Sequence, residues 1–493
     1  MNSDLAFWVN IAAAGNYNGF RLLDISKPED PVVLTTVTCR GAQGDVSFYK
    51  AKNRLLLFVS VDTPQTVPGP PPGGKDCVSA DSTEALGFEG IRIWDVTDPV
   101  APKFVKFVRT DCGSHTHTTI PDYDNQRALI YVSSYPLAAT GIGPNCGQPN
   151  PEVLGRPHGK ISIVEVPDTA PEAAEVLKEV SLHADTIPSV GEDGSLVGSV
   201  GCHDITAFFD ANQASEGGNT KPKPQLAAAA CLSEGQIWDI RDPANPRTQD
   251  PLGHSHVQNE SVEIWHSAAW TWDGQVVLFG DEHGGGSAPG CGGPQDTTGN
   301  IWFYRQVPPP GPLPLLGRYA LERNQLVDQP APQECTLHNF NVIPINDNKA
   351  YIGVSSAYKG GTTVFDFSQA KTQAPFTCPL VPPADPCEFA APIIGKEIGF
   401  YDSHSGDGQG HDDAWSTYWY NDYIYANSGL GRNTVGQNRG FDVYKLLLDA
   451  NMKPCKPEQK GCTPFNARDF HHLNAQTQEG FQTLDGGGTK TGG

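Results

Sequence analysis

Five of the 14 histidines in this 493-residue chain stand at one equivalent position in successive copies of a long repeat. They are His117, His203, His266, His338 and His411. Imidazole is a good ligand for copper, iron, zinc and nickel, and neutral imidazoles lying close together can also transfer protons. The column therefore predicts a transition-metal site (Cu, Fe or Zn), with three or four of the five histidines as ligands.

The repeat that defines this column is a glycine followed by a short β-rich run, and it recurs seven times at intervals of 62 to 79 residues. Apolar residues alternate within each run and turn residues bound it, which indicates a strand. Two further apolar runs precede it, and a proline-bracketed link with a fourth run follows several copies. The seven glycines are Gly19, Gly90, Gly159, Gly235, Gly299, Gly361 and Gly440.

Four antiparallel strands in each of seven repeats predict an all-β, seven-bladed β-propeller. We expect the propeller to span residues 1–447 and an extension at 448–480 to pack on it or close it. Residues 463–480 are candidates for the missing fourth strand of the last blade, and residues 481–493 read as a flexible tail. The blades are expected near residues 1–38, 39–111, 112–182, 201–250, 262–322, 335–400 and 410–447.

Several copies of the repeat carry a family resemblance, in the stretches GNYNGFRLLDISKPEDPV, GIRIWDVTDPVAP, GSHTHTTIP and WHSAAWTWDG. Over roughly residues 1–447 the chain resembles the LVIVD-repeat family of secreted or surface bacterial proteins. The resemblance implies a propeller fold and a location outside the cytoplasm. It implies no particular activity, because the family has none in common.

The histidine column should surround one mouth of the central channel, because the innermost strands of a propeller encircle its axis. By the expected strand order, 12 of the 14 histidines and most long insertions fall on that face, where function is expected. Carboxylates on the same face are candidate catalytic groups or could orient ligands: Glu263, Glu282 and Asp412. The alternative is structural, with each histidine hydrogen-bonded to the neighbouring blade and the acidic loops merely solvated.

The charge balance limits the possible partners. With 56 acidic and 34 basic residues the net charge is −22, which disfavours binding to nucleic acid or to anionic lipid. No apolar run is long enough to span a membrane, and residues 1–14 have no basic export signal, so any such signal is expected to be absent from this chain. A small molecule on the histidine face is the expected partner.

Twelve cysteines without a CxxC pair favour disulfides over a zinc ribbon, and hence a secreted, periplasmic or cell-surface protein. Paired strand ends within a blade predict the bonds Cys39–Cys77, Cys112–Cys146 and Cys202–Cys231. Cys291 and Cys335 hold the complementary positions in adjacent blades and should pair with each other, while Cys378–Cys387 and Cys455–Cys462 should close local loops.

Three functions fit these observations. The first is a metal-dependent enzyme, most plausibly an oxidoreductase, acting on a small molecule. The second is a non-catalytic surface or extracellular binding module of the LVIVD-repeat type. The third is a hydrolase or lyase that uses histidine and carboxylate without a metal.

Overall fold

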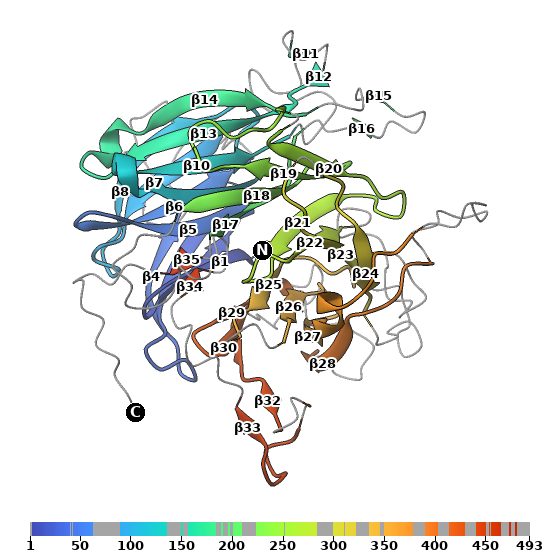
Figure 1. Ribbon diagram of the computed structural model, residues 1–493. Helices are drawn as coiled ribbons and strands as arrows, with labels where there is room; N and C mark the ends of the chain where they lie inside the picture. The colour runs from blue at the N-terminus through green and yellow to red at the C-terminus, as the bar shows by residue number, and fades with distance from the viewer. Residues whose placement is uncertain are drawn as a thin grey trace.

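The computed structural model describes most of the chain, with gaps that fall mainly between strands (Figure 1). The described residues are 2–39, 41, 43–62, 89–135, 149–150, 156–183, 189–190, 196–197, 201–209, 223–250, 252–282, 299–309, 311–321, 335–345, 350–377, 390–402, 414–428, 440–449, 453, 455–464, 473–474 and 479–480.

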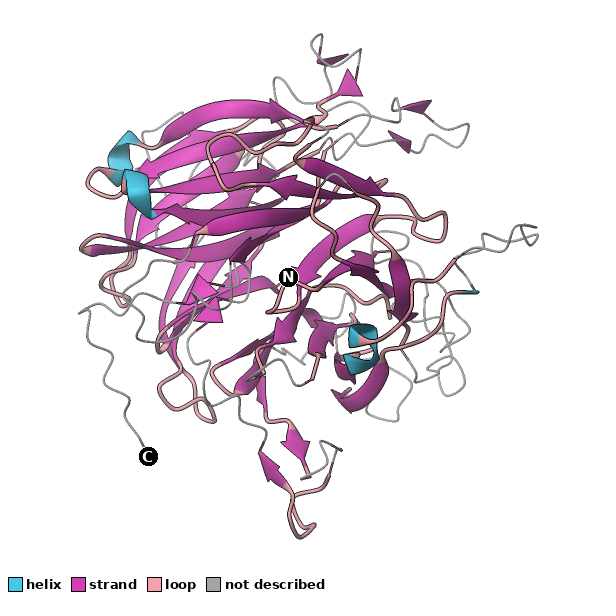
Figure 2. Cartoon of the chain, viewed as in Figure 1, coloured by secondary structure: helices cyan, strands magenta, loops and turns pink. Residues whose placement is uncertain are grey.

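Seven antiparallel sheets account for most of the described chain, and Figure 2 shows strands with only short helical turns. Blades one and two are β1 (Asn2–Trp8), β2 (Ile11–Asn16), β3 (Gly19–Asp24) and β4 (Val32–Thr38), then β5 (Gln43–Ala51), β6 (Arg54–Val61), β7 (Gly90–Asp95) and β8 (Lys103–Arg109). Blades three and four are β9 (Thr116–Asp122), β10 (Arg127–Ser133), β13 (Lys160–Pro167) and β14 (Glu175–Ser181), then β17 (Asp204–Phe209), β18 (Pro224–Ala230), β19 (Gly235–Asp239) and β20 (His254–Val257).

The remaining blades follow the same order from the innermost strand outward. Blades five and six are β21 (Trp265–Trp270), β22 (Val276–Asp281), β23 (Ile301–Arg305) and β24 (Leu315–Tyr319), then β25 (Phe340–Ile343), β26 (Ile352–Ser356), β27 (Thr362–Asp366) and β28 (Lys396–Tyr401). Blade seven has three strands among the described residues: β29 (Ala414–Tyr420), β30 (Tyr423–Ser428) and β31 (Phe441–Tyr444).

Shorter elements lie outside the blades. Three 3₁₀ turns are η2 (Tyr123–Asn125), η4 (Pro171–Ala173) and η8 (Ser368–Lys371). Four two-residue pairings join β11 (Pro149–Asn150) to β12 (Arg156–Pro157), β15 (Ser189–Val190) to β16 (Leu196–Val197), β32 (Leu447–Leu448) to β33 (Thr463–Pro464), and β34 (Leu473–Asn474) to β35 (Glu479–Gly480). Of the residues expected to supply a fourth strand, the described ones are Thr463–Pro464, which pair with β32, and Leu473–Asn474 and Glu479–Gly480, which pair with each other; none of these pairs with β31.

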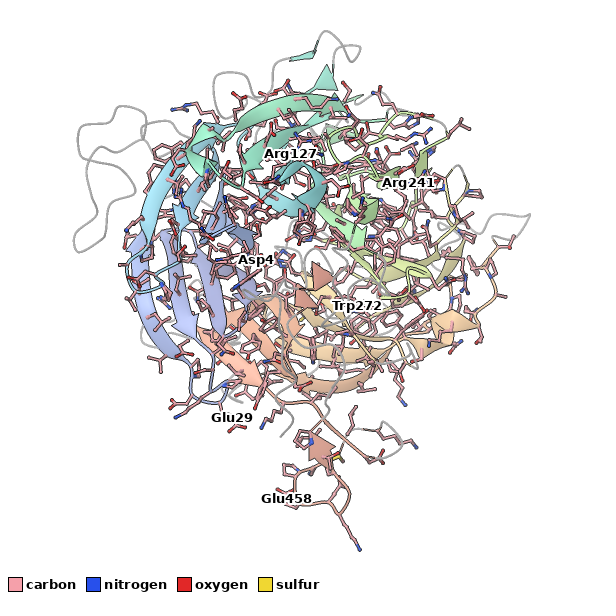
Figure 3. The ribbon with its side chains drawn as sticks, turned by 60° about the vertical axis from the view of Figure 1, so that its left-hand side comes forward. Asp4, Glu29, Arg127, Arg241, Trp272 and Glu458 are labelled. Carbon is pink, nitrogen blue, oxygen red and sulfur yellow. A yellow bond between two sulfur atoms is a disulfide. The ribbon has the colours of Figure 1, made fainter. Side chains whose placement is uncertain are left out.

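The sheets form a closed ring, seen nearly end-on in Figure 3. Each innermost strand contacts the next, in the order β1, β5, β9, β17, β21, β25 and β29, and β29 returns to contact β1. The predicted all-β, seven-bladed propeller is confirmed.

The core lies between the blades, with one apolar cluster at each of the seven junctions. β6 shows how the sequence achieves this, because successive side chains on a strand point to opposite faces. Leu55 and Leu57 pack toward blade one, while Leu56 and Phe58 pack toward blade three. A strand buried on both faces is apolar throughout, which explains runs such as RLLLFVSV.

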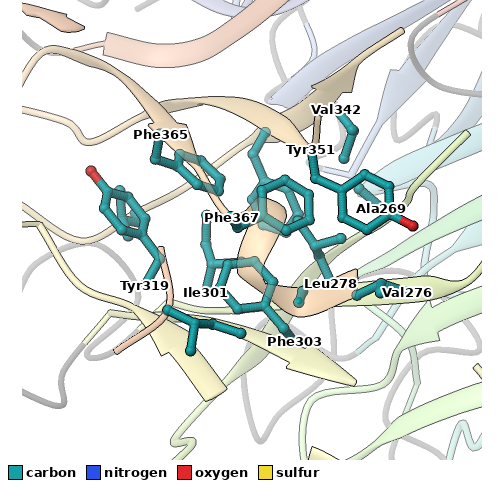
Figure 4. Packing of buried hydrophobic residues seen from close by; sticks show 14 of the residues in the cluster. Ala269, Val276, Leu278, Ile301, Phe303, Tyr319, Val342, Tyr351, Phe365 and Phe367 are labelled. Carbon is teal, nitrogen blue, oxygen red and sulfur yellow. The ribbon is translucent and has the colours of Figure 1, made fainter. Parts of the chain in front are cut away.

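Aromatic side chains fill the junction between blades five and six, shown in Figure 4. Phe303 stacks on Phe367 with ring centroids 4.8 Å apart, and Tyr319 stacks on Phe365 at 4.3 Å. Large flat rings cover the faces of both sheets, so the two blades are held at a fixed spacing.

Blade seven closes on blade one through side chains, since the two blades share no strand among the described residues. Phe7 stacks on Tyr420 at 4.7 Å, and the buried Asn427 side chain donates to the Ser3 and Gly15 carbonyls at 3.0 Å each. These contacts place the first strand of the chain against the last blade.

Two of the predicted disulfides, Cys202–Cys231 and Cys455–Cys462, are present. Cys39, Cys112 and Cys335 are also disulfide-bonded, and the partners predicted for them lie outside the described residues, as do Cys378 and Cys387.

Replacing Phe7 tests the closure of the ring. Phe7→Ala should lower the free energy of unfolding by about 3–5 kcal/mol, because it opens a cavity where blade one packs on blade seven. Phe400→Ala is the matched control, since that ring is 58% exposed, and its effect should stay within about 0.5 kcal/mol. Denaturant unfolding measures both, and equal effects of the two substitutions would contradict the packing.

Candidate functional site

Four of the five column histidines lie in the described part of the chain, and all four are buried at the start of innermost strands. His117 lies in β9 and His266 in β21, while His203 stands directly before β17 and His338 two residues before β25. His411 and Asp412 lie outside the described residues.

Three of these rings form a continuous row across blades four, five and six. The ring centroids of His203 and His266 are 3.7 Å apart, and those of His266 and His338 are 4.3 Å apart. His115 extends the row from blade three, with its centroid 4.4 Å from that of His203. We call His115, His203, His266 and His338 the imidazole row.

Glu282 is the carboxylate that the fold brings to this row. It follows β22 directly, and its backbone N–H donates to the Ile264 carbonyl at 3.0 Å, which fixes its position beside the start of β21. Its carboxylate oxygens lie 3.4 Å from His266 Nε2 and 3.4 Å from His338 Nε2. The Tyr358 hydroxyl donates to the same carboxylate.

Hydrogen bonds at the far nitrogens fix the tautomers of two rings. His338 Nδ1 donates to the Trp415 carbonyl at 2.5 Å. His266 Nδ1 lies 2.5 Å from Ser267 Oγ, which itself donates to Asn339 Oδ1, so the imidazole must be the donor of this pair. Both Nε2 atoms therefore present lone pairs to Glu282.

His203, His266 and Glu282 form a group that could hold a metal ion. One ligand atom from each lies within 4.8 Å of the others, and all three residues are buried. Neither His203 Nδ1 nor His266 Nε2 has a hydrogen-bond partner among the described residues. A buried polar atom without a partner is costly, and a coordinated ion would satisfy both nitrogens.

Burial sets the protonation of the cluster. It lowers the pKa of His203 and of His266 well below the ordinary value, with the neighbouring histidines adding to the effect, so both rings are neutral ligands at pH 7. Burial also raises the pKa of Glu282 to about 7, and the Tyr358 hydrogen bond opposes that rise. Glu282 can therefore hold a proton or release it near neutral pH.

His117 lies apart from the row and faces blade two. Its Nε2 is 2.7 Å from Ser47 Oγ, its Nδ1 is 2.7 Å from Ser60 Oγ, and its backbone N–H donates to Asp45 at 2.6 Å. Burial lowers its pKa to about 3. These contacts match the structural alternative, in which a histidine joins neighbouring blades.

Glu263 is likewise not brought to the row, because its side chain is exposed at the surface. Its backbone N–H donates to Asp281 Oδ1 at 3.1 Å. Asp281 accepts two more backbone N–H groups, from Ile264 and Gly299, and so anchors the turn that presents Glu282.

Sequence reasoning did not single out His115, Tyr135 and Tyr358. His115 Nδ1 pairs with Asp62 at 2.8 Å, and the Tyr135 hydroxyl lies 3.2 Å from His115 Nε2. The tyrosines had a detectable signal, because both follow the second strand of a blade, in the related stretches VSSY and VSSAY.

The channel below the row holds a cavity lined by Asp4, Asp45 and Asp204. Asp4 accepts a hydrogen bond from Tyr418 at 2.7 Å, and Figure 3 places it near the centre of the ring. Burial raises the pKa of Asp4 well above its ordinary value, and the adjacent Asp45 raises it further.

No family model matches this chain, and no curated protein matches it. Similar solved structures include the Pseudomonas aeruginosa periplasmic gluconolactonase PpgL, at 13% identity over 90% of this chain and 99% of that one, with a TM-score of 0.46. Saccharomyces cerevisiae Sqt1 matches at 10% identity over 94% and 91%, with a TM-score of 0.42. The β-propeller domain of Myceliophteria thermophila Cps50 (Swd1) matches at 11% over 86% and 93%, with a TM-score of 0.40.

Sequence identities and TM-scores this low do not indicate a function. The fold is established by the strand pairing and packing of the chain itself. Nor does any match support the LVIVD-repeat resemblance, which stays a prediction. None of the described helices has the length and apolar character needed to cross a membrane. The chain is thus a β-propeller with a buried histidine and carboxylate cluster near its axis.

His117→Ala should weaken the fold, because it leaves Ser47, Ser60 and Asp45 without the ring that joins them. The expected loss is about 1–3 kcal/mol in the free energy of unfolding, measured by denaturant titration. Val33→Ala, at a 53% exposed position, is the control. An unchanged stability of His117→Ala would show that the ring does not hold the two blades together.

Asp4→Asn should change how stability depends on pH. The folded state binds the Asp4 proton more tightly than the unfolded state, so this contribution is complete at low pH and is lost as pH rises through the raised pKa. The parent should therefore lose more stability than Asp4→Asn between weakly acidic and alkaline pH. Asp30→Asn replaces an exposed acid and is the control; its free energy of unfolding should depend on pH as that of the parent does. If the curves of unfolding free energy against pH run parallel for the parent and Asp4→Asn, the predicted contribution of Asp4 is wrong.

Proposed function

We propose that His203, His266 and Glu282, with His338 beside them, bind a transition-metal ion, and that this protein is a metal-dependent oxidoreductase acting on a small molecule. The observation that carries the proposal is that one ligand atom from each of His203, His266 and Glu282 lies within 4.8 Å of the others, and that all three residues are buried. His266 Nε2 and His338 Nε2 each lie 3.4 Å from Glu282. Three electron-rich groups this close repel one another unless a cation or a proton lies between them.

The donor set favours a redox-active ion. Two histidines and one carboxylate on one side of an ion form the facial arrangement of non-haem iron oxygenases, which leaves positions open for substrate and dioxygen. Copper and zinc also accept imidazole, so the ion is iron, copper or zinc in that order of fit. Such an ion would polarise a bound substrate or activate dioxygen.

The surrounding residues fit this role. Tyr358 donates to Glu282 and orients its carboxylate, while Trp415 and Ser267 orient the rings of His338 and His266. His115 lies next to His203, and its Nδ1 is held by Asp62. The small-molecule partner would bind on the histidine face of the propeller.

A second candidate function uses the same residues without a metal. Glu282 has a pKa of about 7, and it lies 3.4 Å from two neutral imidazoles. A proton shared in this way suits general acid–base catalysis by a hydrolase or lyase. Metal analysis separates the two functions.

We also propose that the protein works outside the cytoplasm, in the periplasm, at the cell surface or in the medium. Disulfides at Cys202–Cys231 and Cys455–Cys462 support an oxidising compartment, as does the absence of free cysteines among the residues described.

Glu282→Gln tests the metal site, because glutamine keeps the shape of the side chain and removes the charge. Protein without a histidine tag is stripped with a chelator, reloaded with Fe²⁺, Cu²⁺ or Zn²⁺ and assayed for metal content and affinity. We expect at least a tenfold loss of affinity in Glu282→Gln, the scale seen when groups at a metal site are removed. Glu263→Gln is the matched control and should bind as the parent does.

Circular dichroism and melting curves of the metal-free proteins separate lost binding from lost fold. A parent protein that takes up none of the three ions, or a Glu282→Gln protein that binds as tightly as the parent, would refute the metal site. The first result, with an activity that depends on Glu282, would favour the acid–base function.

A further inference from the structure

A second histidine cluster lies at the outer edge of the propeller, between blades three and four. His183 follows β14, the outermost strand of blade three, and His254 and His256 lie on β20, the outermost strand of blade four. The ring centroid of His183 is 4.3 Å from that of His254 and 5.2 Å from that of His256, while the last two are 5.5 Å apart. We call these three residues the rim cluster.

The strand geometry explains why the rings meet. His254 and His256 are two residues apart on a strand, so their side chains project from the same face. They pair across to Trp238 and Gln236 of β19, which fixes the register of β20. Ser255, between them, points to the opposite face.

Hydrogen bonds between the two blades hold His183 in place beside that strand. The side chains of Thr248 and Gln249, just before β20, donate to the Ser181 and Leu182 carbonyls at 2.8 and 2.9 Å. The Leu182 N–H also donates to the Gly159 carbonyl at 2.9 Å. His183, which follows Leu182, is therefore held near the start of β20 by hydrogen bonds that do not involve the three imidazoles.

The chemistry of this cluster is that of a metal site with three nitrogen ligands. One ring nitrogen from each histidine lies within 4.8 Å of the other two. His254 is buried, whereas His183 and His256 are only partly covered, so the cluster is open to ions from solvent. Three imidazoles with a free fourth position suit Zn²⁺ or Cu²⁺.

The rim cluster is separate from the axial site. The two share no residue, and the inner and outer strands of blade four are three strand spacings apart, about 14 Å. An ion at the axis cannot also be held at the rim. Whether metal binds at the rim is therefore independent of the proposed function.

We propose that His183, His254 and His256 form a second transition-metal site, which takes Zn²⁺ or Cu²⁺ and joins the outer edges of blades three and four. Two of its ligands come from one blade and the third from the next, so a bound ion links the two sheets. Binding to the folded chain alone then raises the melting temperature.

Titration of metal-free, untagged full-length protein with Zn²⁺ against a chromophoric chelator tests this site. The double variant H254Q/H256Q should bind one equivalent fewer than the parent and lose the rise in melting temperature due to that equivalent. Ser255→Ala, on the same strand, should bind as the parent does. Glu282→Gln should still bind one equivalent of Zn²⁺ at the rim cluster. Loss of metal binding at the axial site can therefore be distinguished from loss of metal binding at the rim cluster.

Cu²⁺ provides a spectroscopic readout at the same site. Cu²⁺ added to Glu282→Gln should give an electron paramagnetic resonance signal split by imidazole nitrogens, and adding H254Q/H256Q should abolish that signal. If the double variant folds poorly, the single variant His256→Gln can replace it, because that side chain is only partly buried. The affinity of the rim cluster for metal should then fall at least tenfold. Unchanged stoichiometry and affinity in these variants would overturn the proposal and leave the cluster as packed rings.

Discussion

Burial of both faces of every sheet is the constraint on which this structure depends. The inner strands of each blade are covered on both faces, because each blade packs against two neighbours through apolar clusters. The last junction, between blades seven and one, is held by contacts of Phe7, Tyr420 and Asn427. Once this junction closes, equivalent residues of different blades must meet around one axis.

The axial site follows from that meeting. His203, His266 and His338 come from three different blades, and no local segment of the chain could bring their rings within 3.7–4.3 Å of one another. Their side chains are buried, which keeps the imidazoles neutral and raises the pKa of Glu282. The same burial that stabilises the blades thus prepares ligands for a cation.

Much of the fold was predictable, because the alternation of apolar residues and the spacing of the repeat are local signals. The number of blades, their strand order and the Cys202–Cys231 bond follow from them. The seventh blade departs from the pattern after Tyr444, where Leu446 and Leu448 pack into the junction with blade six and the chain leaves the sheet.

The site was predictable only in part, because a repeat position fixes where a side chain starts but not what surrounds it. His117 occupies the same column as His266, yet Ser47 and Ser60 of blade two receive its ring. Glu263 and Glu282 were equal candidates by sequence, and only the turn anchored on Asp281 directs one inward. These differences arise from contacts between blades, which no single repeat encodes.

The most direct measurement of the central claim is anomalous X-ray diffraction from crystals of the untagged, metal-loaded protein at the iron, copper and zinc edges. The account predicts a peak between His203, His266 and Glu282, with ligand atoms about 2.0–2.2 Å from the ion. A map without a peak there, in which Glu282 instead shares a proton with His266 or His338, would contradict it.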